Sequence, residues 1–233
     1  MGAMILAAGR GERMRPLSDA TPKPLLCAGG KPLIVWQIEA FVRAGLTDIV
    51  VNASHRADDL AAALGDGRTF GARIAWSREA EPLEVAGGIT TALPLLPAGP
   101  LIVASGDVWS AFDIATLIPR AQTMAHDSAA PRAHLVMVPN PPYHPQGDFA
   151  LRGNAVIAGG AARLTFGNIA IYDTALFAGL QRGVEQKMLP LFNAWIAKGI
   201  VTGERYDGPW ANVGTPADLA ELDARLARAP STT

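Results

Sequence analysis

The sequence predicts an α/β fold: a doubly wound, mainly parallel β-sheet with helices on both faces. Short apolar runs alternate with amphipathic helical segments through the first half of the chain, as they do in βαβ units. The first run, Met4 to Ala8, is apolar throughout, which is typical of a parallel strand that is buried on both faces. Right-handed crossovers bring the ends of such strands to one crevice, so the predicted sheet is Rossmann-like.

Glycines separate the predicted elements of the first half. Apolar residues recur at a helical period over 33–44, and Gly45 ends that helix. Gly87 and Gly88 are expected to open a later helix. The predicted strands are 4–8, 48–52, 73–77 and 101–105, and the predicted helices are 33–44, 57–64 and 87–96.

The second half of the chain is less regular. An Ala/Ser/Pro-rich stretch, 122–132, predicts a loose connection, and 140–149 is too rich in proline for regular structure. Short segments after this loop predict a small antiparallel sub-sheet. The remaining predicted strands are 134–139, 150–151, 155–158 and 164–172, and the remaining predicted helices are 187–198 and 216–226.

Composition predicts a soluble globular protein. The chain has 233 residues, 49% of them hydrophobic, and a net charge of −1, so it can form a sizeable core. We interpret it as one domain, 1–233, with halves 1–120 and 121–233. The cations cluster in one loop, no apolar run is long enough to span a bilayer, and the single Cys27 has no internal disulfide partner. These features predict a cytoplasmic protein without nucleic-acid or membrane partners and leave its oligomeric state open.

The loop after the first strand has the composition of a polyphosphate site. Gly9 and Gly11 permit a tight turn whose N–H groups can face an anion at close range. The loop is neither a P-loop nor a dinucleotide fingerprint, since Met14 stands where the latter needs its third glycine. Prolines then keep the segment from starting a helix. The loop carries the cations Arg10, Arg13, Arg15 and Lys23.

The stretch LAAGRGERMRPLSDATPKPL, from Leu6 to Leu25, resembles the signature of the sugar-1-phosphate nucleotidyltransferases. Only Ser18 departs from the pattern, and it keeps the hydroxyl of the usual Thr. The alternative is a surface loop whose cations are solvated. The resemblance implies that the loop binds a nucleoside triphosphate and that Arg15 and Lys23 neutralise its charge. The nucleotide contacts implied here are Leu6, Ala7, Ala8, Gly9, Gly11, Glu12, Arg13 and Lys23.

The segment EPLEVAGGI, which begins at Glu81, is similar to the family segment that holds the nucleotide base. Its form resembles the branch that uses UTP. The alternative is a plain helix-opening turn. The implied base contacts are Glu81, Pro82, Gly87 and Gly88.

Two positions are candidates for a magnesium site. Asp107 follows the strand 101–105 at the ligand crevice, where one carboxylate and phosphate oxygens can hold Mg²⁺. It matches the family's metal aspartate, although a turn-forming Asp is the alternative. The segment 206–215 resembles the family motif W-x-D-(V/I/T)-G-T, with Asn212 in place of the second metal carboxylate. An amide oxygen still ligates Mg²⁺ but brings no charge, so weaker binding is expected.

The loop 140–149 resembles the stretch with Asn-Pro, His and Gly-Asp-Phe in the N-acetylmuramate-1-phosphate uridylyltransferases. The candidate sugar contacts are Ser105, Asp148 and Asn168. His144 is either a general base or a solvated loop residue. Asn168 offers a donor and an acceptor to a sugar, and a structural bond to backbone is the alternative.

The resemblance covers nearly the whole chain and implies a Mg²⁺-dependent enzyme. It would transfer UMP from UTP to a sugar 1-phosphate, specifically N-acetylmuramate 1-phosphate, and release pyrophosphate, as a step of cell-wall (peptidoglycan) recycling. The half 1–120 would bind the nucleotide and the half 121–233 the sugar. Arg15, Lys23 and Asp107 are the expected catalytic residues. The alternatives are a glucose-1-phosphate or mannose-1-phosphate nucleotidyltransferase and a non-catalytic sugar-nucleotide sensor.

Overall fold

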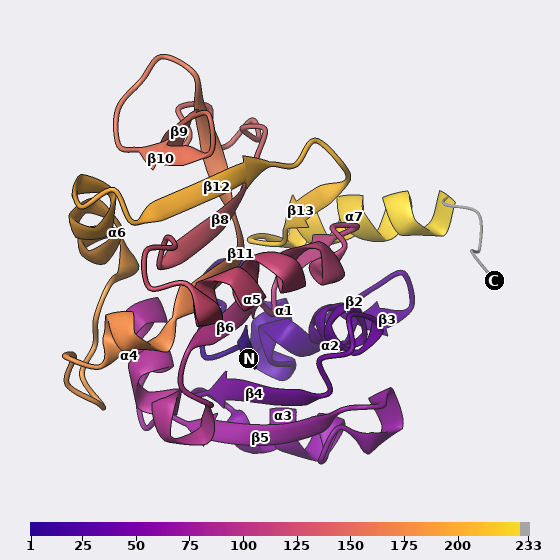
Figure 1. The fold of residues 1–233 in the computed structure, drawn as a ribbon. Helices are drawn as coiled ribbons and strands as arrows, with labels where there is room; N and C mark the ends of the chain where they lie inside the picture. The colour runs from indigo at the N-terminus through magenta and orange to yellow at the C-terminus, as the bar shows by residue number, and fades with distance from the viewer. Residues whose placement is uncertain (229–233) are drawn as a thin grey trace.

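A computed structural model of the chain describes residues 1–228 and contains one large sheet with two small ribbons. The large sheet has nine strands in the order β5-β4-β1-β6-β11-β8-β12-β10-β9 (Figure 1). Its strands are β1 Gly2–Leu6, β4 Asp48–Ala53, β5 Arg73–Arg78, β6 Pro100–Ser105, β8 Ala133–Val138, β9 Phe149–Arg152, β10 Ala155–Ile157, β11 Arg163–Asp173 and β12 Val201–Arg205. The ribbons pair β7 Val108–Ser110 with β13 Trp210–Asn212, and β2 Cys27–Ala28 with β3 Lys31–Pro32.

The strands of the first half form the parallel part of the sheet. β1 lies between β4 and β6, so that Met4 is in register with both Val50 and Val103. The predicted doubly wound α/β class is therefore confirmed, and its strands lie within two residues of their predicted bounds. The first strand ends at Leu6 and not at Ala8, because the Ala7 N–H donates to the Asn52 side chain at 2.8 Å instead of continuing the ladder.

The strands of the second half continue the same sheet. β11 runs antiparallel to β6 on one side and to β8 on the other, and so joins the two halves. The predicted strand 164–172 is part of this element, which is long and central where a short strand was expected. The expected sub-sheet exists as β9 and β10, which pair antiparallel with each other.

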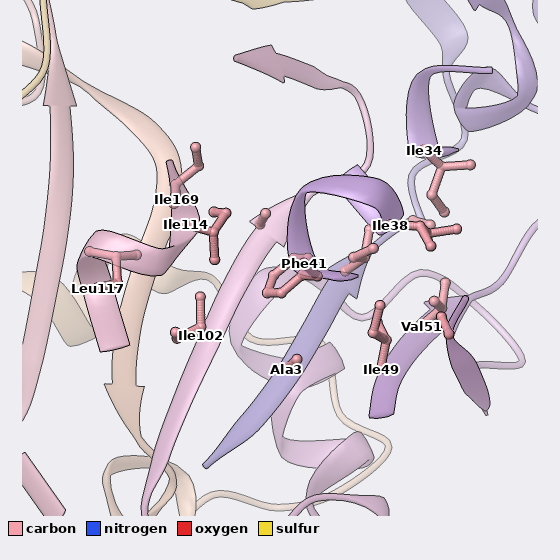
Figure 2. Packing of buried hydrophobic residues seen from close by; sticks show 14 of the residues in the cluster. Ala3, Ile34, Ile38, Phe41, Ile49, Val51, Ile102, Ile114, Leu117 and Ile169 are labelled. Carbon is pink, nitrogen blue, oxygen red and sulfur yellow. The ribbon is translucent and has the colours of Figure 1, made fainter. Parts of the chain in front are cut away.

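Helices cover both faces of the sheet, as predicted. α2 Leu33–Arg43, α3 Ala57–Leu64 and α5 Ile118–His126 pack on one face, and α4 Glu84–Ala92 and α6 Met188–Ala197 pack on the other. Figure 2 shows α2 pointing Ile34, Ile38 and Phe41 towards the strands, and all three side chains are fully buried. The first residues of the predicted loose connection 122–132 belong to α5, so that prediction is wrong for 122–126. The sequence did not indicate this helix because only two of its residues, Ala121 and Met124, are buried, which leaves little apolar periodicity.

A third apolar cluster ties the loop after β1 to the last helix, α7 Pro216–Arg228. Met14 from this loop is fully buried, and Leu222 of α7 is 1% exposed. The Gly29 N–H also donates to the Asp223 carboxylate at 2.8 Å. The short α1, Leu17–Ala20, lies in the same loop region. Within residues 1–228, no helix has both the length and the apolar character needed to cross a membrane.

Candidate active site

Two adjoining cavities lie at the carboxyl ends of β1 and β6. The first has a volume of about 710 Å³ and the second about 540 Å³, and both are lined by Leu6, Val85 and Ser105. Of the residues predicted to contact the nucleotide, those that line the first cavity are Leu6, Ala7, Ala8, Gly9, Lys23, Glu81 and Pro82. All the predicted sugar contacts line the second cavity, namely Ser105, Asp148 and Asn168.

The loop after β1 folds back so that Lys23 returns to the end of the strand. Gly11 has a φ of 66°, a left-handed conformation, and a Cβ at this position would lie 3.0 Å from the Cβ of Lys23. The Ser18 hydroxyl closes the turn by donating to the Gly11 carbonyl at 2.8 Å. The buried Met14 fixes the loop to the core below. The turn at Gly11, its bond from Ser18 and the buried Met14 therefore give the loop a shape that brings Lys23 to the crevice.

Lys23 and Asp107 form an ion pair at the edge of the first cavity. The Lys23 Nζ lies 2.5 Å from Asp107 Oδ2, and their side chains are only 10% and 30% exposed. The pair joins the loop of the first strand to the residue that follows β6, as the crevice rule predicts. A lysine held against a carboxylate at this depth is an ordered cation at the wall of the first cavity.

The arginines of the loop occupy different environments. Arg10 pairs with Glu81 at 2.6 Å across the first cavity, and Arg13 lines the second cavity. Arg15 pairs with Asp19 at 3.2 Å, its side chain is 68% exposed, and it lines neither cavity. Of the two arginines near the turn, the geometry favours Arg13 over Arg15 for contact with a phosphate.

A buried polar network supports the first cavity, and the sequence did not identify it. The Asn52 amide donates to Glu79 at 2.6 Å, and Glu79 accepts a hydrogen bond from the Leu83 N–H at 3.1 Å. Burial raises the pKa of the Glu79 carboxyl. Since Asn52 also accepts from Ala7, the network locks the end of β1 to the segment before α4. The available signal was a polar residue at or just after the carboxyl end of each of two predicted strands.

Gly87 and Gly88 have a packing role. The prediction that they open a helix is wrong, because α4 begins at Glu84 and contains both glycines. A Cβ at Gly87 would lie 2.4 Å from the Val184 carbonyl, and one at Gly88 would lie 2.7 Å from the Asn52 amide nitrogen. Neither glycine lines the first cavity, so base contact by them stays a prediction.

The ribbon of β7 and β13 brings the two predicted metal ligands together. Asn212 pairs with Val108, and the Val213 N–H donates to the Asp107 carbonyl at 3.0 Å. Asp107 lines the first cavity and Asn212 the second, so the ribbon lies where the cavities meet. The described part of the chain holds no cluster of three or more His, Cys, Asp or Glu side chains suited to a metal. A carboxylate and an amide oxygen fit Mg²⁺ only if phosphate oxygens and water complete its shell.

The polar rim of the second cavity comes from the loop between β8 and β9. Asp148 Oδ1 lies 3.1 Å from the His144 ring, and Asp148 Oδ2 accepts the Phe166 N–H at 2.8 Å. These bonds anchor the loop on β11, so Asp148 has a structural role in addition to the predicted sugar contact. Tyr143 of this loop also lines the second cavity, and partial desolvation raises the pKa of its phenol.

Asn168 sits in an irregularity of β11. Its φ is 58°, and the pairing of β11 with β8 shifts register between Phe166 and Ala170. Asn tolerates the left-handed region better than most residues, and such bulges often re-aim a side chain beside a site. The conformation is consistent with a side chain displayed to the second cavity, which it lines.

Three kinds of similarity agree with this geometry. The family model described as "Nucleotidyl transferase" matches residues 2–144. An N-acetylmuramate alpha-1-phosphate uridylyltransferase of Neisseria meningitidis serogroup B is 42% identical over 96% of this chain and 97% of its own length. A protein of the same name from Caulobacter vibrioides is 34% identical over 97% of each chain.

Solved structures share the fold. A Bacillus anthracis protein in complex with sucrose has a TM-score of 0.87 at 20% identity and covers 100% of this chain, with 98% of its own chain covered. HddC from Yersinia pseudotuberculosis has a TM-score of 0.76 at 21% identity and covers 96% of this chain, with 98% of its own chain covered.

Proposed function

Because this chain belongs to the nucleotidyl transferase family, we propose that it transfers UMP from UTP to N-acetylmuramate 1-phosphate and releases pyrophosphate. The observation that carries the proposal is the meeting of the two cavities beside the Lys23–Asp107 ion pair. A nucleotide in the first cavity and a sugar phosphate in the second would present their phosphates to each other there.

The proposed reaction requires the protein to position two substrates and to neutralise the negative charge of their phosphates. A sugar-phosphate oxygen attacks the α-phosphorus of UTP in line, the bond to the β-phosphate oxygen breaks, and pyrophosphate leaves. The attacking oxygen is already ionised at neutral pH, so the chain need not supply a general base or a covalent nucleophile. Its contribution is to hold both phosphates in line.

Lys23 is placed to neutralise the charge that develops on the phosphate oxygens. The Asp107 carboxylate and the Asn212 amide oxygen would hold Mg²⁺, which when bound supplies further charge neutralisation. Arg13, which lines the second cavity, is placed to meet the phosphate of the sugar. Arg15 stays a predicted catalytic residue, although its exposed ion pair with Asp19 supports the role less well. The proposed reaction is a cytoplasmic step of peptidoglycan recycling.

A pyrophosphate-release assay tests the proposal. Purified protein and Mg²⁺ are mixed with each of UTP, CTP, GTP and dTTP and with N-acetylmuramate, glucose or mannose 1-phosphate. The expected result is release with UTP and N-acetylmuramate 1-phosphate at the highest kcat/KM. A higher kcat/KM with glucose or mannose 1-phosphate would replace this assignment by one of the other sugar-1-phosphate reactions.

A second candidate is a non-catalytic sugar-nucleotide sensor. Asn212 favours it, since this residue removes one negative charge from the proposed metal site. The same assay separates the two, because a sensor would bind UTP and sugar phosphate without releasing pyrophosphate.

A further inference from the structure

Tyr172 is an almost fully buried tyrosine near the end of β11, and it lines the second cavity. The residue is 1% exposed and packs against Phe177, Phe192 and Trp195. Burial raises the pKa of its phenol, and no hydrogen bond offsets that effect. Its oxygen is not one of the enclosed polar side-chain atoms that lack a partner in the described part of the chain, which belong to Arg225. A phenol hydroxyl at a cavity wall can donate to a bound molecule.

Tyr172 lines the second cavity. Phe166, Asn168, Ala170 and Tyr172 are alternate residues of β11, and all of them line that cavity. The irregularity in β11 does not break this alternation, since four steps along β11, from Phe166 to Ala170, match two steps along β8, from Met137 to Leu135. One face of β11 therefore forms a continuous wall, and Tyr172 lies about 13 Å along the strand from Asn168.

The two ends of this wall differ in chemistry. The charged or titratable side chains among the described residues that line the second cavity, other than tyrosine, are Arg13, His144 and Asp148. Asp148 bonds the N–H of Phe166, at the Asn168 end of β11. Near Tyr172 the strand partner Leu101, the neighbouring Ala170 and the α6 residue Phe192 are all apolar. The Tyr172 end of this wall thus combines apolar side chains with a single hydroxyl.

This combination suits a small neutral group that has a methyl and one hydrogen-bond acceptor. A carboxylate or an ammonium would lose its water there without gaining an ionic partner, which is costly. An amide carbonyl would accept the Tyr172 O–H, and its methyl would contact apolar side chains such as Phe192. An acetamido substituent has both parts.

We propose that Tyr172 selects N-acylated amino sugars, with its hydroxyl donating to the carbonyl oxygen of the acylamino group. This inference rests on the proposed function and names the residue that would bind the acylamino substituent of the sugar. A site built to bond a polar substituent discriminates strongly against an analogue that lacks it, because the protein group is then left unpaired.

The test compares Tyr172→Phe with the unaltered protein on a matched pair of substrates. The pair is N-acetylmuramate 1-phosphate and its de-N-acetylated counterpart. The variant should lose about tenfold in kcat/KM for the acetylated sugar, which corresponds to about 1.4 kcal/mol. It should change by less than about twofold for the other sugar, since only the acetylated sugar uses the hydroxyl. Tyr206→Phe is the matched control, because the Tyr206 hydroxyl bonds the Pro209 carbonyl and Tyr206 lines neither cavity.

Calorimetric binding of the two sugar phosphates is measured in parallel, so that the inference does not depend on turnover. If the unaltered protein releases no pyrophosphate but binds the acetylated sugar more tightly, and Tyr172→Phe removes this preference, the proposed function fails and the selection by Tyr172 stands. A preference that survives in Tyr172→Phe, or an equal loss for both sugars, overturns the inference. A melting temperature close to that of the unaltered protein shows that the variant is folded.

Discussion

The two cavities differ in the way they are built. The first is bordered by ion pairs and a buried polar network: Lys23 with Asp107, Arg10 with Glu81, and Asn52 behind them. The second is walled largely by aromatic and aliphatic side chains from β11 and α6, with isolated polar groups. Preorganised charges stabilise charge that develops in a reaction, whereas apolar walls with few polar groups discriminate between shapes. In the proposed reaction, the first cavity therefore balances charge and the second selects the substrate.

The sheet explains this division. The first cavity lies beyond the ends of parallel strands, where backbone N–H groups and loop residues converge. The second lies along one face of the antiparallel strand β11, where every second side chain contributes. Loops with polar residues meet at the end of a strand. The face of a strand instead carries side chains that also pack in the core.

Removing Lys23 tests the charge-balancing role of the first cavity. We expect Lys23→Met to lower kcat by a factor on the order of 10²–10³, because a preorganised cation is lost where charge develops. The KM for the sugar phosphate should change little. Lys31→Met is the matched control, since Lys31 pairs with Glu39 at 2.6 Å and lines neither cavity. Near-normal turnover of Lys23→Met would remove Lys23 from the catalytic residues.

Comparing Arg13→Ala with Arg15→Ala shows which arginine serves the junction of the cavities. We expect Arg13→Ala to lower kcat/KM by about tenfold or more, as loss of a charge-assisted bond to phosphate would. Arg15→Ala should change it by less than about threefold, because an exposed ion pair contributes little. Steady-state kinetics of the two variants decides the matter, and the opposite order would restore the sequence-based assignment to Arg15.

Placing a carboxylate at position 212 tests whether the charge of this side chain affects metal binding where the two cavities meet. Asn212→Asp should lower the Mg²⁺ concentration at half-maximal rate by several-fold, since a charged oxygen binds the ion more tightly than an amide oxygen. Asn154→Asp, which adds the same charge at an exposed residue just after β9, is the control. An unchanged magnesium titration would show that position 212 is not a ligand.

The smallest expected effect concerns stability in the second half. Burial lowers the pKa of His134, which lies between Thr202 and Glu204 and feels the charge of Arg120. The unfolded chain then binds the His134 proton more readily, so the free energy of unfolding should fall as pH drops through about 6.5. Urea unfolding between pH 5 and 8 should show a flatter dependence for His134→Gln, by on the order of 1 kcal/mol.

The matched control for that experiment is His126→Gln, since His126 is exposed at the end of α5. An identical pH dependence for His134→Gln and the unaltered protein would contradict the prediction.

The buried acid Glu79 behind the first cavity changes the free energy of unfolding with pH in the opposite direction to His134. Burial raises its pKa, so its contribution to stability is present below about 4.3 and is lost as pH rises through its folded pKa.

Most of the fold could be predicted from the sequence because apolar runs and glycines mark parallel strands and helix ends directly. The predicted helix 57–64 coincides with α3, and 33–44 differs from α2 by one residue. Helix α5 was not predicted, since most of its residues are exposed and only Ala121 and Met124 are buried. The start of α4 was missed because Gly87 and Gly88 serve packing inside the helix and not its opening.

The first cavity was easier to predict than the second for a physical reason. Its loop is contiguous in sequence, so glycines, prolines and cations appear together between Leu6 and Leu25. The second cavity collects residues from β6, β11, α6 and the loop before β9, and no local pattern unites them. In the sequence, Tyr172 has the appearance of an ordinary strand residue, and only the folded chain shows that it lines the second cavity.

The ribbon of β7 and β13 has a consequence for biosynthesis. Asp107 leaves the ribosome before the strand that carries Asn212, because that strand lies far downstream in the sequence. A nascent chain that has not reached Trp210 lacks the strand that pairs with β7, and it also lacks α7, which packs against Met14 of the opening loop. Such a nascent chain is expected to be inactive, so competence would arise only after β13 and α7 have emerged and packed on the first half.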